Sequence, residues 1–370
     1  MQTLYLDRLA RVARELQGGE IDALLLTPGA SMFYLSGFEH GHAAERLLAL
    51  TVTRDGAVSW IVPTMNVEQV KASPLGDRPI RAWGDGEGYL PSLREAIGTA
   101  KSVAFDDDAR AAFLLDIASV APNAKLSKAS SIMRALRARK DSAELERLRA
   151  AGKIVDETIP KAVSLCRAGV RECDLETQLR AALMARSPES AVAFTIVASG
   201  PNGALPHHET ARRILQKGDV VILDFGVREP GGYHSDITVT CAVGEPADPE
   251  VRKVYQTVWE AQQAAIKAVR PGATCQDVDR AARGVIEAAG YGPYFLHRTG
   301  HGLGLQVHEP PFMVGGNTET LEEGMVFSIE PGIYLPGRFG VRLEIIASVS
   351  AAGVSLINEI SAAEIPLSRE

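Results

Sequence analysis

One segment constrains the fold of this chain more than any other, and it runs from Asp219 to Val243. Its pattern predicts two apolar strands, Val220–Phe225 and Tyr233–Val243, joined by a turn at two glycines, which take positive φ without steric cost. Each strand carries one carboxylate, Asp224 or Asp236. Facing carboxylates in a buried hairpin repel each other unless a cation lies between them. The hairpin therefore predicts a cation site, although two exposed edge aspartates are the alternative on this segment alone.

The C-terminal part of the chain repeats this placement of acids in strands. The strand patterns Met325–Tyr334 and Gly340–Ile345 each hold one glutamate among apolar neighbours, and a glycine-rich run before them holds three histidines within twelve residues. Strand alternation puts Arg342 and Glu344 on one face. We expect these side chains to converge with the hairpin acids on one cavity. The converging groups are the carboxylates Asp224, Asp236, Glu330 and Glu344, together with one or more of the histidines His297, His301 and His308.

Four carboxylates and an imidazole suit two divalent cations such as Mn²⁺, Co²⁺, Fe²⁺ or Zn²⁺. Two such ions about 3.5–4 Å apart can share a water and lower its pKa, while a glutamate takes the proton and a histidine steadies the oxyanion. This is machinery for amide hydrolysis. His207, on a loop before the hairpin, is the candidate oxyanion partner, with a structural histidine as the alternative. The role of His208 stays open.

Four segments of the chain resemble segments of the metallopeptidases of the pita-bread fold, which include methionine aminopeptidases, aminopeptidase P and prolidase. These segments are GYHSDIT, TGHGLGLQVHEPP, GMVFSIEPGIY and GVRLE. The resemblance implies two bound ions, Mn²⁺ or Co²⁺ being favoured and Zn²⁺ possible. The implied metal ligands are Asp224, Asp236, His301, Glu330 and Glu344. Glu330 would also be the general base for a metal-bridging hydroxide. The other implied catalytic residues are His207 and His308 beside the scissile carbonyl, with His297 and Arg342 in supporting or substrate-binding positions.

The chain departs from the family pattern at three places. Asp224 and Asp236 are twelve residues apart where the family usually has eleven, and we place the extra residue in the turn. Val239 stands where the family has an arginine, and Ile345 where it has an acid. The last two departures could change substrate selection or dimer contacts.

The length predicts two domains, and we expect an α+β protein. Residues 1–130 would form a smaller α/β domain, similar to the creatinase/prolidase N-terminal domain through IDALLLTPGASMFYLSGF. Residues 131–370 would form the pita-bread catalytic domain. The charged helical stretch Ser127–Ile159 is interpreted as a solvated linking helix at the boundary. His40, His42 and Arg46 of the first domain are candidates to limit substrate length, across a dimer if one forms.

Together these features predict an Xaa-Pro dipeptidase acting on small peptides with proline at the second position. The alternatives are aminopeptidase P, metal-free creatinase and an inactive binding relative. A net charge of −7 argues against nucleic-acid binding, and no apolar run approaches a membrane helix. The N-terminus has no signal-peptide core, and the four cysteines lack C-x-x-C spacing, so we expect free thiols and a cytoplasmic protein. A homodimer is expected from the resemblance.

Overall fold

The structure is a computed structural model that describes residues 2–39 and 45–368. His40 and His42 lie outside the described residues. The chain forms two compact units, Met1–Arg137 and Ala138–Glu370, so the division falls a little beyond residue 130. Within the described ranges, no helix is both long and apolar enough to cross a membrane. The four cysteines are free thiols, as expected.

The first unit is a mixed six-stranded sheet flanked by helices. The strand order is β4-β3-β2-β1-β5-β6, in which β1–β2 and β2–β3 are antiparallel and the other pairs are parallel. The strands are β1 Ala23–Leu26, β2 Ala49–Thr53, β3 Val58–Pro63, β4 Ile80–Trp83, β5 Ser102–Phe105 and β6 Lys125–Lys128. The helices are α1 Gln2–Gly18, α2 Ala30–Ser36, α3 Val67–Lys71, α4 Leu90–Ile97, α5 Ala111–Val120 and α6 Ser130–Arg137. β2 and β3 are consecutive in the chain and form an antiparallel hairpin.

The second unit places strands between two groups of helices. One sheet has the order β17-β9-β8-β7, another has the order β11-β10-β12-β15-β16, and β13 pairs with β14. The strands of the first sheet are β7 Ala191–Ser199, β8 Val220–Arg228, β9 Ile237–Val243 and β17 Leu367–Ser368. The others are β10 Gly300–Gly302, β11 Glu309–Met313, β12 Val326–Ile329, β13 Gly332–Leu335, β14 Phe339–Arg342, β15 Ile345–Ser350 and β16 Gly353–Leu356.

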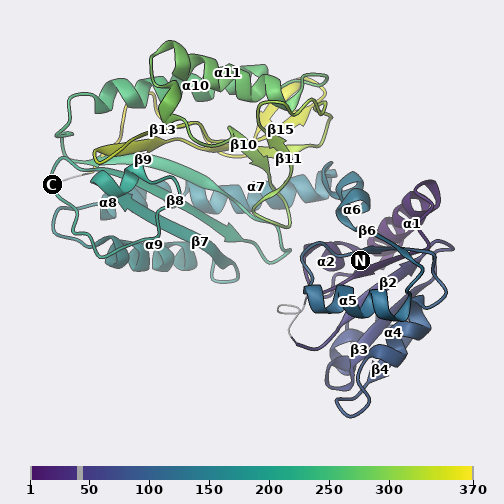
Figure 1. Cartoon of the computed structure of the whole chain (residues 1–370). Coiled ribbons are helices and arrows are strands. Elements are labelled where there is room, and N and C mark those ends of the chain that lie inside the picture. Colours follow the sequence, from purple (N-terminus) through teal and green to yellow (C-terminus); the bar gives the residue numbers. More distant parts are fainter. Residues whose placement is uncertain (1, 40–44, 369–370) are drawn as a thin grey trace. The chain divides into compact units, whose positions relative to one another are not determined.

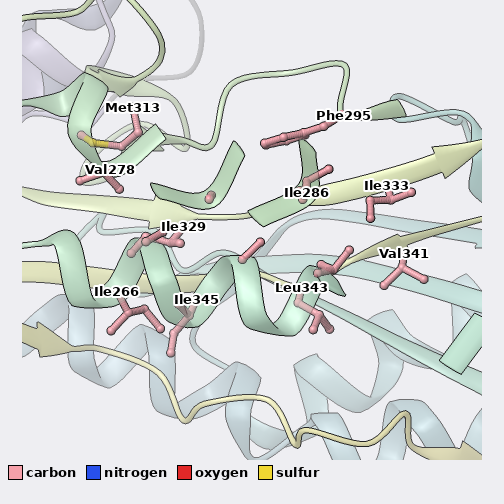
Figure 2. Close-up of a cluster of buried hydrophobic side chains, with 14 of the residues drawn as sticks. Ile266, Val278, Ile286, Phe295, Met313, Ile329, Ile333, Val341, Leu343 and Ile345 are labelled. Carbon is pink, nitrogen blue, oxygen red and sulfur yellow. The ribbon is translucent and has the colours of Figure 1, made fainter. Parts of the chain in front are cut away.

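Helices cover both outer faces of these strands, with α10 and α11 on one side and α8 and α9 on the other (Figure 1). Their bounds are α7 Ser142–Asp156, α8 Ile159–Leu165, α9 Glu172–Arg186, α10 Val251–Ala268 and α11 Cys275–Ala288. One core lies between α10, α11 and the strands beneath them, and Figure 2 shows part of it. A second core joins α7, α8 and α9 to β7, β8 and β9. The strands thus have an apolar face toward each helix group and an inner region between the cores.

Strand alternation explains why acids occur in the buried hairpin. Residues 221, 223, 225 and 227 of β8 and residues 237, 239, 241 and 243 of β9 pack into the core beneath α7, α8 and α9. The intervening side chains, Asp224 and Thr238 among them, point to the inner region, and these two residues pair across the strands. Val239 is therefore a core residue, and Ile345 is fully buried in the other core. Neither departure from the family pattern faces the cavity described below.

Four local predictions need correction. The return strand begins at Ile237 rather than Tyr233, so Asp236 lies just before β9 instead of within it. Glu330 directly follows β12, and Glu344 lies in the break between β14 and β15, so neither glutamate is inside a strand. The expected linking helix is two helices, α6 and α7, separated by a short non-helical segment. In that segment Lys140 is buried, although the charge pattern predicted a solvated face.

Candidate metal centre and active site

A cavity of about 710 Å³ in the second unit collects every residue proposed for the site. The predicted residues that line it are His207, Asp224, Asp236, His297, His301, His308, Glu330, Arg342 and Glu344. Apolar residues form another part of the wall, namely Ala193, Phe194 and Ile196 of β7 together with Pro206 and Val307. His207 and His308 are exposed to the open part of the cavity, whereas Asp236, His301 and Glu344 are buried. The buried end is therefore acidic and the open end carries imidazoles.

The buried end has the donor atoms that a divalent cation requires. Asp236, His301 and Glu344 each offer one ligand atom, and these atoms lie within 4.8 Å of one another. Oδ1 of Asp224 and Oε1 of Glu344 are buried and have no hydrogen-bond partner in the described structure. A buried carboxylate oxygen without a partner is costly, and oxygen with imidazole nitrogen is the donor set of Mn²⁺, Co²⁺ or Zn²⁺. The residues present thus fit bound divalent metal.

The imidazole of His301 gives the clearest indication of a cation site. Its Nδ1 donates to the carbonyl oxygen of Gly302 at 3.1 Å, which assigns the proton to Nδ1. The bare Nε2 lies 3.2 Å from Oε1 of Glu330 and 3.6 Å from Oδ2 of Asp236. Burial lowers the pKa of His301 to about 4, so the ring is neutral near pH 7. A nitrogen lone pair facing two carboxylates is repulsive unless a positive ion lies between them.

The electrostatics of the acids agree with that conclusion. Burial, reinforced by repulsion from neighbouring carboxylates, raises the pKa of Asp236 and of Glu344 well above the usual range. Burial also raises the pKa of Glu330, which His297 and Arg342 partly offset. One arginine does not neutralise four acids, so without a further cation some of these carboxyl groups would have to take up protons. Bound divalent cations would allow them to stay ionised.

Arg342 connects the acids of the two strand systems. Its Nη2 donates to Oδ2 of Asp224 at 2.6 Å, and its Nε donates to Oγ1 of Thr238 at 3.1 Å. Thr238 in turn donates to Oε2 of Glu344 at 2.8 Å. The Nη1 atom donates to the hydroxyl of Tyr334 at 3.0 Å and to the carbonyl oxygen of Pro206 at 3.3 Å. The guanidinium is thus engaged with protein groups, which favours an orienting role over a bidentate clamp on substrate.

His297 also makes its hydrogen bonds within the protein. Nδ1 donates to the carbonyl oxygen of Arg298 at 2.7 Å, and Nε2 accepts from the Tyr334 hydroxyl at 2.8 Å. Burial lowers the pKa of His297, in keeping with this neutral tautomer. Both ring nitrogens are occupied, so the contacts favour a positioning role. Tyr334 itself was not predicted as a site residue, because a tyrosine at the end of an apolar strand pattern is typical of a core.

Two further residues were missed by the sequence analysis. Arg298 lines the cavity, stacks over the ring of Phe312 at 4.4 Å and makes no side-chain hydrogen bond or ion pair with the described residues. Its position inside the histidine-rich run was an available signal. Glu172 is fully buried and accepts from Nε2 of His208 at 3.1 Å, so the contacts give His208 a structural role. The position of Glu172 at the start of a helix did not indicate that its side chain would be buried against His208.

Arg46 makes an exposed ion pair with Asp85 at 2.9 Å inside the first unit. Its role in limiting substrate length stays a prediction.

Comparison with known proteins shows the family to which the chain belongs. Residues 146–351 match the model of metallopeptidase family M24, and residues 8–139 match the creatinase/prolidase N-terminal domain. The chain is 39% identical to the probable dipeptidase PepE of Mycobacterium tuberculosis, over 96% of this chain and 94% of that protein. It is 36% identical to the Xaa-Pro dipeptidase of Lactobacillus helveticus, over 91% of this chain and 92% of that protein. The crystal structure of dipeptidase PepE from Mycobacterium ulcerans superposes with a TM-score of 0.94 at 38% identity, covering 99% of this chain and 98% of that chain. The chain belongs to metallopeptidase family M24, with the two-domain creatinase-type and pita-bread architecture that its sequence pattern predicts.

Proposed function

We propose that the protein hydrolyses Xaa-Pro peptide bonds, most simply as an Xaa-Pro dipeptidase that uses two divalent metal ions. The observation that carries this proposal is the buried end of the cavity. There the bare Nε2 of His301 faces Oε1 of Glu330 and Oδ2 of Asp236. Oδ1 of Asp224 and Oε1 of Glu344 are buried there without a hydrogen-bond partner among the described residues. The ions would be held by Asp224, Asp236, His301, Glu330 and Glu344. The Xaa-Pro dipeptidase of L. helveticus supports the choice of substrate.

Bound divalent cations would polarise the scissile carbonyl and lower the pKa of an attacking water. Glu330 supplies the base, because burial raises the pKa of its carboxyl and enables it to hold a proton before passing it to the leaving proline nitrogen. Its Oε1 also accepts from Oγ of Ser328 at 3.2 Å, which orients the carboxylate. His207 and His308 extend from the open side of the cavity, where they would donate to the carbonyl oxygen as it gains charge.

The rest of the cavity suits a short peptide. Phe194 and Ile196 offer an apolar wall for an uncharged side chain. Arg298 offers a cation that makes no ion pair with the described residues, placed to attract a carboxylate of the peptide. These features support binding of a small substrate that carries its own charged ends.

Aminopeptidase P is the second candidate, and the size of the cavity is the observation in its favour. About 710 Å³ is more space than a dipeptide fills, so a longer peptide could enter a single chain. A dipeptidase would need some group to occupy that space, and His40, His42 and Arg46 stay our candidates. We include a homodimer in the proposal, because a partner chain could supply such a group.

The proposal is tested with chelated protein that is reloaded separately with Mn²⁺, Co²⁺ or Zn²⁺. We expect no turnover after chelation, recovery with at least one of these ions, and binding of two ions per chain by calorimetry. Cleavage of Ala-Pro with little cleavage of Ala-Pro-Ala identifies a dipeptidase, and the reverse preference identifies aminopeptidase P. Ala-Ala is the matched substrate without proline. Equal cleavage of Ala-Ala and Ala-Pro, or undiminished activity in EDTA, would refute the proposal.

A further inference from the structure

A buried ion pair lies directly behind the loop that carries His308. The Nζ atom of Lys140 is 2.9 Å from Oε1 of Glu309, and the two side chains are only 1% and 4% exposed. The same Nζ donates to the carbonyl oxygen of Ala138 at 3.4 Å. The mechanism proposed above uses neither residue. We propose that Lys140 and Glu309 form a positioning pair that holds His308 in the active site, an inference that rests on the proposed function.

The backbone places Glu309 at the junction between two histidines of the cavity. It is the first residue of β11 and pairs with Gly302, the residue that follows His301. The register shifts at that point, and the chain between the two strands forms a loop that ends at His308. The rings of His301 and His308 meet edge to face with centroids 4.1 Å apart. A displacement of Glu309 therefore moves the backbone next to both imidazoles.

The carboxylate of Glu309 lies against the inside of this loop. Its Oε2 accepts from the backbone N–H of Gln306 at 3.4 Å. A Cβ atom on Gly304 would lie 2.6 Å from Oε1 of Glu309, so a larger residue at this position would have to displace the carboxylate. The carbonyl oxygen of Gly304 also accepts from the backbone N–H of His234 at 2.9 Å. The carboxylate thus contacts the loop at Gly304 and at Gln306.

Lys140 holds that carboxylate from a fixed backbone. Its N–H donates to the carbonyl oxygen of Gly324 at 2.8 Å, and the preceding residue, Arg139, forms an antiparallel bridge with Met325 just before β12. A buried carboxylate without a counter-charge would seek water or a proton. Removal of the lysine would therefore release Glu309 from its place and loosen residues 303–308. The positive charge that orders this part of the site therefore comes from Lys140, near the start of the second unit.

The test compares Lys140→Met with Lys153→Met, a matched control because Lys153 lies on the exposed face of α7. We expect Lys140→Met to lower kcat/KM for Ala-Pro by about 10- to 100-fold, as outer-sphere substitutions do in metal sites. Lys153→Met should change it less than about twofold. If Lys140 acts through His308, its removal should cost less than about twofold in a His308→Ala background. An equal loss in both backgrounds, or no loss at all, would overturn the proposal.

Amide hydrogen exchange provides a readout that does not depend on turnover. We expect the peptide covering residues 303–309 to exchange at least about tenfold faster in Lys140→Met, while helices α10 and α11 keep their protection. If Lys140→Met does not fold, Lys140→Met/Glu309→Gln removes both charges together and should show the same local loosening. Unchanged exchange in the variant that folds refutes the positioning pair. Wild-type protein that exchanges as expected but never cleaves Ala-Pro would refute the proposed function and leave the pair intact.

Discussion

Replacement of Glu172 by glutamine tests how the loop that carries His207 is held. Oε1 of Glu172 accepts from the N–H and the hydroxyl of Ser199, at 2.7 and 2.6 Å, and from Asn202 at 3.1 Å. Oε2 accepts from Asn202 at 3.1 Å, from His208 at 3.1 Å and from the N–H of Ala211 at 3.2 Å. The whole segment from Ser199 to Ala211 is therefore organised around one carboxylate.

The size of the effect follows from these bonds. In Glu172→Gln, one acceptor oxygen becomes an amide NH₂, and at least two donors then face another donor whichever way the amide is turned. Each buried donor left without an acceptor costs about 1–3 kcal/mol, so the free energy of unfolding should fall by about 2–6 kcal/mol. That is a large part of the roughly 5–15 kcal/mol typical of a native protein. We also expect kcat/KM for Ala-Pro to fall, because His207 precedes the histidine that the carboxylate holds.

Urea unfolding followed by circular dichroism measures this loss, with Glu189→Gln at an exposed position as the control. The difference in the free energy of unfolding between the wild type and Glu172→Gln should also depend on pH. Burial would raise the pKa of Glu172, but the hydrogen bonds from Ser199, Asn202 and His208 hold it below its ordinary value of 4.5. The carboxylate therefore stabilises the fold fully above pH 4.5 and loses this contribution as the pH falls below it. A loss under about 1 kcal/mol at pH 7, or a difference unaffected by acid, would refute the reasoning.

Two further substitutions test the active site. Glu330→Gln keeps a ligand oxygen but removes the base, so kcat for Ala-Pro should fall by about 10²- to 10⁴-fold with metal content measured in parallel; a fall of less than tenfold would assign the base elsewhere. Arg298→Met removes a cation that makes no ion pair with the described residues, so KM for Ala-Pro should rise by about tenfold while kcat changes little. The same variant should leave KM for Ala-prolinamide, which lacks the carboxylate, unchanged; equal effects on both substrates would exclude a carboxylate contact.

The sequence predicted which side chains of a strand face the core better than it predicted where each strand or helix begins and ends. Alternation in β8 and β9 follows from apolar residues that must enter the core beneath α9, and this leaves Asp224 and Thr238 on the opposite face. The bounds were less predictable. Glu330 and Glu344 lie in breaks between strands, because the short strands β12 to β15 change partners there. An apolar pattern shows burial but not where pairing stops.

Buried charges were the main feature that the sequence could not reveal. Lys140 belongs to a charged stretch that is typical of a solvent-exposed helix, and its partner Glu309 is far away along the chain. Glu172 similarly resembles any acid at a helix N-terminus until its five donor groups are seen together. Such residues are identified only by tertiary contacts, because hydrophobic periodicity carries no information about which distant charge will pair with them. The acids that line the cavity were easier to select from the sequence, since they interrupt apolar patterns.

The place of Lys140 in the chain affects any attempt to produce the second unit alone or to exchange the first unit for another. A truncation that begins at Ser142, the start of α7, looks natural but removes Lys140 together with Asp141, which caps that helix. The shortened polypeptide would retain every residue that lines the cavity while leaving Glu309 buried without its cation. A fusion joint or a truncation therefore has to lie upstream of Ala138 if the excised half is to keep its active site in order.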